Sequence, residues 1–166
     1  MNSIEEEKLF KIRFEQHKDI IYRLCLGYFN QNRALAEDAL QEAFMKAWIY
    51  RKQFREDANW QTWIYRIAVN TCLLKIKQEK KEKDKTESFT QQPQAEYDAE
   101  KESKIQKRYQ CIEKLNSQNR ILILMVLEGI PYATIEETLG LSSENLRVKI
   151  PRIKKQLYTC MSHGTL

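Results

Sequence analysis

The stretch AEDALQEAFMKAW, residues 36–48, decides the fold class of this chain. Its apolar side chains recur every three or four residues, so they form one stripe along a helix rather than one face of a strand. The stripe consists of Ala36, Ala39, Leu40, Ala43, Phe44, Ala47 and Trp48. Asp38, Gln41 and Glu42 share the same spacing on another face. The stretch therefore predicts an amphipathic helix whose acidic face is open either to solvent or to a protein partner.

Helical periodicity continues on both sides of this stretch. Residues 20–28 form an apolar stripe on a helix that is expected to end near Asn30. Residues 60–71 form a third stripe, and Asp57 or Asn59 is available as the N-cap of its helix. Alternating strand patterns and hairpin dipeptides are nearly absent from the sequence. These observations predict a helical unit covering residues 8–77.

A change of composition marks the end of this unit. Residues 77–88 read KQEKKEKDKTES and contain no large apolar side chain. A segment of this kind buries too little apolar surface to offset the conformational entropy lost on ordering. Residues 78–102 are therefore predicted to be a linker that is flexible or only transiently helical, whose lysines are either solvated or in contact with phosphates.

A second helical unit is predicted for residues 103–160. It contains the strongly apolar segment SQNRILILMVLEG, for which Ser117 is the expected N-cap, followed by PYATIEETLG, which ends at Gly140. A short turn then leads into the last helix, ENLRVKIPRIKKQL, residues 144–157. Two helices joined by a glycine-containing turn, with a basic second helix, are typical of a helix-turn-helix.

The last helix has the properties of a DNA-recognition helix. Residues 144–157 have a net charge of +4, and their apolar stripe consists of Leu146, Ile150, Ile153 and Leu157. Most basic side chains are therefore expected to point outward, where they suit phosphates and base edges in a major groove; the alternative is a basic surface that only aids solubility. Pro151 removes a backbone donor, so a kink or a redirected basic end is expected.

The stretch DANWQTWIYRIAVN, residues 57–70, gathers two of the chain's three tryptophans. Aromatic rings beside Arg66 and Asn70 are suited to unpaired bases, because rings stack on bases and an amide reads a base edge. A helical aromatic cluster is also a common way to build a core. The sequence leaves both interpretations open, with some of these rings expected in the core and others at the surface.

Composition bounds the remaining possibilities. The chain has 166 residues and a net charge of +5, which is compatible with nucleic acid. No apolar run reaches the length of a membrane span and no signal peptide is recognisable, so a cytoplasmic protein is expected. The four cysteines form no C-x-x-C pair, so reduced, buried thiols are predicted rather than a zinc site or disulfides. No nucleophile–base pair, metal cluster or phosphate loop points to an enzyme or a cofactor.

In combination these segments resemble the extracytoplasmic-function sigma factors of bacteria. AEDALQEAFMKAW resembles the region-two pattern of that family, FREDANWQTWIYRIAVN its promoter-opening helix, and EGIPYATIEETLGLS its region four. The resemblance covers about residues 10–160. The chain departs from the family pattern at Pro131 and Thr134, which together remove a Ser-x-x-Glu capping box, and at Pro151.

The resemblance implies a role for each group of residues. Contact with the −10 promoter element is implied for Phe54, Trp60, Trp63, Tyr65, Arg66, Ile67 and Asn70. Contact with the −35 element is implied for Glu144, Asn145, Leu146, Arg147, Lys149 and Arg152. Contact with the clamp helices of the largest subunit of core RNA polymerase is implied for Asp38, Gln41, Glu42 and Trp48.

The expectation is therefore an all-α protein of two small helical domains joined by a flexible linker, the second with a helix-turn-helix. Its implied function is that of a sigma factor, which binds core RNA polymerase, directs it to promoters and assists strand opening. Promoter DNA, the polymerase and an anti-sigma factor are the implied partners, without insertion into a membrane. The alternatives are a stand-alone helix-turn-helix regulator and a sigma-like interaction protein that has lost DNA binding.

Overall fold

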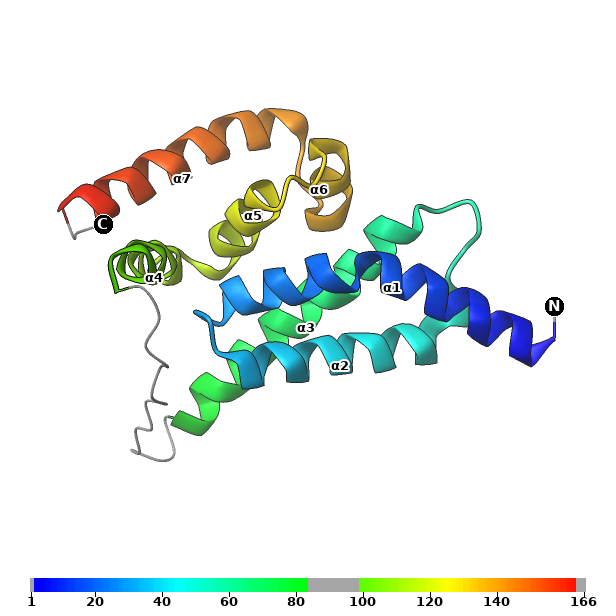
Figure 1. The fold of residues 1–166 in the computed structure, drawn as a ribbon. Coiled ribbons are helices and arrows are strands. Elements are labelled where there is room, and N and C mark those ends of the chain that lie inside the picture. Colours follow the sequence, from blue (N-terminus) through cyan, green and yellow to red (C-terminus); the bar gives the residue numbers. More distant parts are fainter. Residues whose placement is uncertain (1, 84–98, 164–166) are drawn as a thin grey trace.

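The computed structural model describes residues 2–83 and 99–163, and all regular secondary structure in these two ranges is helical (Figure 1). The elements are α1 (Ser3–Tyr28), α2 (Arg33–Tyr50), the 3-10 turn η1 (Arg51–Gln53), α3 (Trp60–Lys83), α4 (Ala99–Glu113), α5 (Ser117–Leu127), α6 (Tyr132–Leu139) and α7 (Ser143–His163). The prediction of an all-α fold is confirmed. None of the helices described is both long enough and apolar enough to cross a membrane.

The first unit consists of α1, α2 and α3, which pack against one another (Figure 1). Helix α2 turns its small residues inward, since Ala36, Ala39, Ala43 and Ala47 are all 0% exposed. Small side chains let neighbouring helices approach closely, and the larger rings of α1 and α3 fill the rest of the core. The hub is Phe10 of α1, whose ring lies 5.1 Å from that of Trp48 and 5.7 Å from that of Trp60.

Asparagine side chains set the helix boundaries of the first unit. Asn32 Oδ1 accepts from the backbone of Leu35 and caps α2, and Asn59 Oδ1 accepts from the backbone of Gln61 at the start of α3. Helix α1 ends at Tyr28, close to the predicted end at Asn30. Asn30 itself has a positive φ of 49° and begins the turn into α2.

The second unit consists of α4 to α7. Helix α5 is its centre, with Ile121, Leu122, Ile123, Leu124 and Met125 all buried. Asn116, rather than the predicted Ser117, caps this helix, because its Oδ1 accepts from the backbone of Asn119 at 2.9 Å. Gly140 ends α6 with a φ of 66°, as the sequence predicts.

The segment predicted as the linker, residues 78–102, is helical at both of its ends. Helix α3 continues to Lys83 and α4 already begins at Ala99, so both ends of the predicted linker are helical. Residues 84–98 lie outside the described residues. Lysine and glutamate are good helix formers, which accounts for the extension of α3 beyond the last apolar position of its stripe.

Helix α7 passes through Pro151 without a break and runs from Ser143 to His163. Proline cannot donate to the carbonyl of Arg147, four residues back. Arg147 and Pro151 are both exposed, so that carbonyl lies on the face of the helix that water reaches. The helix therefore tolerates the missing hydrogen bond at a position where solvent replaces it.

The prediction of reduced thiols is wrong for two of the cysteines. Cys111 of α4 and Cys160 of α7 form a disulfide with a Cα–Cα distance of 5.9 Å, although 49 residues separate them. Cys25 of α1 and Cys72 of α3 are free and buried, with their sulfur atoms 3.5 Å apart. Spacing along the chain gives no sign of either pair, because both arise from helix packing.

Reduction of the disulfide is expected to lower the free energy of unfolding, because the bond closes a long loop and constrains the unfolded chain. The chain-entropy relation gives about 4 kcal/mol for a loop of this length. Urea unfolding of the oxidised protein with and without a reductant measures the difference. The variant Cys111→Ser/Cys160→Ser should be insensitive to reductant, and equal unfolding midpoints for the wild type in both conditions would contradict the prediction.

Candidate nucleic-acid and protein interfaces

The tryptophans at the start of α3 form an aromatic group with Phe54. The ring of Trp60 lies 5.1 Å from that of Phe54 and 4.9 Å from that of Trp63, and both tryptophans are half-buried. The guanidinium of Arg13, on α1, lies 5.4 Å from the Trp60 ring and adds a cation–π contact. This group therefore joins the core to the surface, as the sequence predicts for the aromatic cluster in general.

Tyr65 belongs entirely to the core, which corrects the expectation that it faces DNA. It is 0% exposed, and its ring packs edge-on against that of His17 at 5.6 Å. Burial raises the pKa of the Tyr65 hydroxyl, while a hydrogen bond from Gln61 opposes that rise. A ring enclosed in this way has no free face for a base, so Tyr65 is removed from the candidate site.

Arg66 and Asn70 are exposed on α3, and Ile67 beside them is half-buried. Arg66 donates from Nε to the backbone carbonyl of Glu137, on α6, at 3.0 Å, and its Nη2 donates to the same oxygen. Asn70 is seven residues beyond Trp63, which corresponds to roughly 10 Å along a helix axis. The structure therefore places Asn70 on the same helix as Trp60 and Trp63, whereas Phe54 lies in the segment before that helix.

The acidic face of α2 is exposed as predicted. Asp38 and Gln41 are exposed, Glu42 is half-buried, and Trp48 further along the helix is half-buried beneath the guanidinium of Arg51, which lies 3.8 Å from its ring. Asp38 and Gln41 are three residues apart, so they project from the same side of the helix. This side presents carboxylate and amide groups on a chain whose net charge is positive.

Two lysines form ion pairs with the carboxylates of this acidic face, and the sequence did not predict them. Lys75 of α3 lies 3.2 Å from an Asp38 oxygen and 3.0 Å from a Glu42 oxygen, and Lys46 lies 2.6 Å from the other Glu42 oxygen. The pKa of Glu42 is lowered, first by the hydrogen bond from Lys46 and then by that from Lys75. Partial burial tends to lower the pKa of Lys75, but its hydrogen bonds to Glu42 and Asp38 outweigh burial and raise it.

Helices α6 and α7 form the predicted helix-turn-helix. After Gly140, the backbone N–H of Leu141 returns to the carbonyl of Glu136 at 3.1 Å, and Ser142 Oγ accepts from the backbone of Asn145 at 3.2 Å. Ser143 Oγ donates to the Glu136 carboxylate and joins the two helices directly. Helix α6 has no side-chain cap, which agrees with the loss of the capping box at Pro131 and Thr134.

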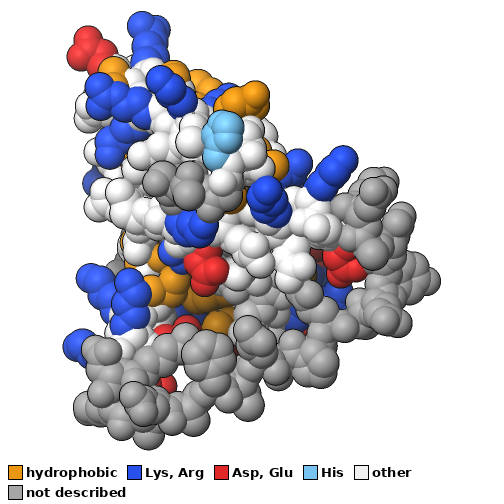
Figure 2. All heavy atoms as spheres, turned by 90° about the vertical axis from the view of Figure 1, so that its left-hand side faces the viewer, with side chains coloured by type: hydrophobic (Ala, Val, Ile, Leu, Met, Phe, Trp, Pro, Cys, Tyr) orange, Lys and Arg blue, Asp and Glu red, His pale blue; other side chains and the backbone are white. Residues whose placement is uncertain are grey.

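The outward face of α7 is basic. Glu144, Asn145, Arg147 and Arg152 are exposed, whereas Lys149 is half-buried. Lys and Arg side chains gather in the upper part of Figure 2, where α7 lies in Figure 1. Leu146 is 1% exposed and belongs to the predicted buried stripe, so its expected contact with DNA is corrected. The other expected residues of this group remain on or at the edge of the outward face.

Two family descriptions match this chain in the order of its two units. Residues 13–82 match Sigma-70 region 2, which covers most of α1, α2 and α3. Residues 106–157 match Sigma-70, region 4, which covers α5, α6, most of α7 and about half of α4.

Curated relatives are similar over short segments. The ECF RNA polymerase sigma factor SigW of Bacillus subtilis (strain 168) is 39% identical over 64 residues, which are 39% of this chain and 34% of that protein. The ECF RNA polymerase sigma-E factor of Haemophilus influenzae is 33% identical over 67 residues, which are 40% of this chain and 34% of that protein. The matched segments thus span about a third of the length of these relatives.

Solved structures share the fold over nearly the whole chain. The sigma factor RpoE of Bartonella quintana, in complex with the anti-sigma factor NepR, has a TM-score of 0.76 at 18% identity, covering 94% of this chain and 98% of that one. CnrH, in complex with the cytosolic domain of CnrY, has a TM-score of 0.69 at 17% identity, covering 94% and 89%. The two matched regions together span most of the chain in the order of the family, so this chain belongs to the sigma-70 family; the curated relatives that match it are extracytoplasmic-function sigma factors.

Proposed function

We propose that this chain is a sigma factor that binds core RNA polymerase, directs it to specific promoters and assists DNA strand opening. One observation carries the proposal: three different surfaces occur in a single chain. They are the acidic face of α2, the Arg66 and Asn70 side of α3, and the basic face of α7 beside α6. A protein surface, a surface for unpaired bases and a duplex-binding helix are the three contacts that this function requires.

The proposal assigns each surface to a partner. Asp38, Gln41, Glu42 and Trp48 meet the clamp helices of the largest polymerase subunit. Contact with the −10 element falls to Asn70, Arg66, Ile67 and the aromatic group of Phe54, Trp60 and Trp63. Contact with the −35 element falls to Glu144, Asn145, Arg147, Lys149 and Arg152.

Further parts of the proposal follow from the same role. The chain acts in the cytoplasm and by binding alone, so no reaction is assigned to it. An anti-sigma factor is its proposed regulator, since both solved neighbours were crystallised or solved with a protein partner and one of these is named an anti-sigma factor. A stand-alone regulator that binds duplex DNA is less favoured, because it gives no role to the acidic face of α2.

Reversing the charge of the acidic face is expected to weaken binding to core RNA polymerase. The variant Asp38→Lys/Gln41→Lys should lose roughly tenfold or more in affinity, equivalent to about 1.4 kcal/mol or more, because like charges then face the surface that accepts carboxylates. Binding of the purified protein to core polymerase measures the effect. Glu37→Lys is the matched control on the same helix. An equal loss of affinity in that variant would show that the effect comes from net charge alone.

Removing the amide of Asn70 is expected to slow promoter opening without weakening polymerase binding. Asn70 is exposed, so Asn70→Ala should leave the melting temperature unchanged. Loss of one base contact worth about 1–3 kcal/mol corresponds to a reduction of about 5- to 150-fold in promoter opening. Permanganate footprinting of the promoter, beside a polymerase-binding assay, measures the two properties separately. Parallel losses in both assays would show that Asn70 does not act on the opened strand.

Removing the charge of Arg147 is expected to flatten the salt dependence of duplex binding. Each phosphate contact contributes about 0.9 to the slope of log affinity against log salt concentration. Arg147→Ala should therefore reduce the slope by roughly that amount, as measured by titrating random-sequence duplex DNA at several salt concentrations. Arg108→Ala, an exposed position on α4, removes the same charge elsewhere. Equal slopes for Arg147→Ala and the wild type would place Arg147 outside the interface.

A further inference from the structure

The outward face of α7 contains an apolar residue among its basic ones. Val148 is 50% exposed and lies near the N-terminal end of the helix, which begins at Ser143. It follows Leu146 by two residues, and two residues turn an α-helix by about 200°. Because Leu146 is buried, Val148 lies on the opposite side of the helix, at the middle of the outward face.

Pro151 extends this apolar surface along the helix. It is exposed and three residues from Val148, so the two side chains project from the same side of α7. Neither side chain can donate or accept a hydrogen bond. A single exposed apolar residue is common on protein surfaces, but here two neighbours occupy the middle of a face that is otherwise charged. Val148 and Pro151 are called the apolar strip of α7.

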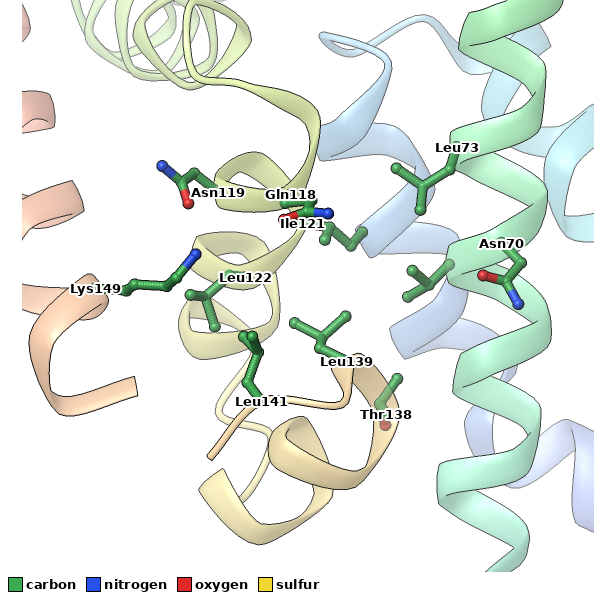
Figure 3. Close-up of a pocket in the computed structure, with 11 residues that line it drawn as sticks. Asn70, Leu73, Gln118, Asn119, Ile121, Leu122, Thr138, Leu139, Leu141 and Lys149 are labelled. Carbon is green, nitrogen blue, oxygen red and sulfur yellow. The ribbon is translucent and has the colours of Figure 1, made fainter. Parts of the chain in front are cut away.

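Cationic side chains flank the apolar strip. Arg147 precedes Val148 and Arg152 follows Pro151, so a turn of about 100° in each direction places the arginines on opposite sides of the strip. Both are exposed, and neither forms an ion pair within residues 2–83 and 99–163. Lys149 marks the edge of this face, because it is half-buried and directed toward α5, where it lines a cavity of about 200 Å³ (Figure 3).

An apolar side chain in the major groove has one well-suited partner among the bases. Every base pair presents hydrogen-bond donors or acceptors there, and thymine alone adds an apolar group, the methyl group on its C5 atom. A donor or acceptor that faced Val148 would lose its water without gaining a hydrogen bond, which is unfavourable. Contact with the C5-methyl group has no such cost and buries apolar surface on both sides.

We propose that Val148, with Pro151 beside it, contacts the C5-methyl group of thymine in the −35 element, so that α7 selects thymine there. This inference rests on the proposed function, which places α7 in the major groove. Val148 is then a specificity-determining residue, whereas Arg147 and Arg152 position the helix on the phosphates. The strip extends about 4.5 Å along the helix axis, and successive nucleotides of one strand are about 3.4 Å apart, so it covers one or two base pairs.

Deoxyuridine tests this contact, because it pairs as thymine does and lacks only the C5-methyl group. The holoenzyme formed from the full chain and core RNA polymerase first selects promoters from a random duplex library. Each thymine of the selected −35 element, on either strand, is then replaced singly by deoxyuridine, and the affinity of the holoenzyme is measured. We expect affinity to fall about fourfold at one position or at two adjacent positions, which is the effect of burying one methyl group.

Variants of Val148 assign the effect to this residue. Val148→Ala should bind the thymine and deoxyuridine promoters equally, and it should fold normally because the position is exposed and alanine is the better helix former. Val148→Ile keeps a branched apolar side chain and should keep the discrimination. Leu127→Ala is the matched control, since it removes an exposed apolar side chain from α5, and it should discriminate as the wild type does.

The possible outcomes separate the thymine contact from the proposed function. A selected −35 element without thymine, or equal affinities of the wild-type holoenzyme for thymine and deoxyuridine at every position, overturns the inference. Discrimination that persists unchanged in Val148→Ala also overturns it, because another residue would then contact the methyl group. A chain that does not bind core polymerase, or that selects no promoter with it, overturns the proposed function and this inference together.

Discussion

In the proposed function helix α3 serves two partners with one surface, and the rest of the structure depends on how that surface is divided. Ile64, Tyr65 and Ala68 are buried in the core, and this burial fixes the rotation of the helix. Once this rotation is fixed, Arg66 and Asn70 are directed away from the core. The side proposed to bind an opened strand is the same side on which α6 rests.

Local periodicity made much of this architecture predictable. The alanine stripe of α2, the buried stripe of α7 and the turn at Gly140 follow from residue spacing, because each reflects interactions within one helix or one turn. Tyr65 was misplaced, because the spacing of residues along this helix is as compatible with a core position for its ring as with a surface one. The end of α3 at Lys83 was missed because a charged segment gives no apolar stripe to follow, although its residues favour helix.

Contacts between distant helices could not be predicted from spacing. The disulfide joins α4 to α7 across 49 residues, and Lys75 reaches Asp38 across 37 residues. Each depends on where one helix lies against another, which a single sequence does not specify. The candidate surfaces were therefore predictable as lists of residues, whereas the way in which they are held or covered was not.

The two electrostatic contacts of α3 connect the proposed interfaces. Lys75 ties the helix to the acidic face of α2, and Arg66, nine residues earlier, ties it to α6. In the proposed function, a cationic partner at Asp38 and Glu42 competes with Lys75 for the same carboxylates, and a DNA strand competes with Glu137 for Arg66. Both competitions would act on residues of the same helix, α3. The proposed polymerase contact and the proposed strand contact are therefore both linked to α3, through Lys75 and Arg66.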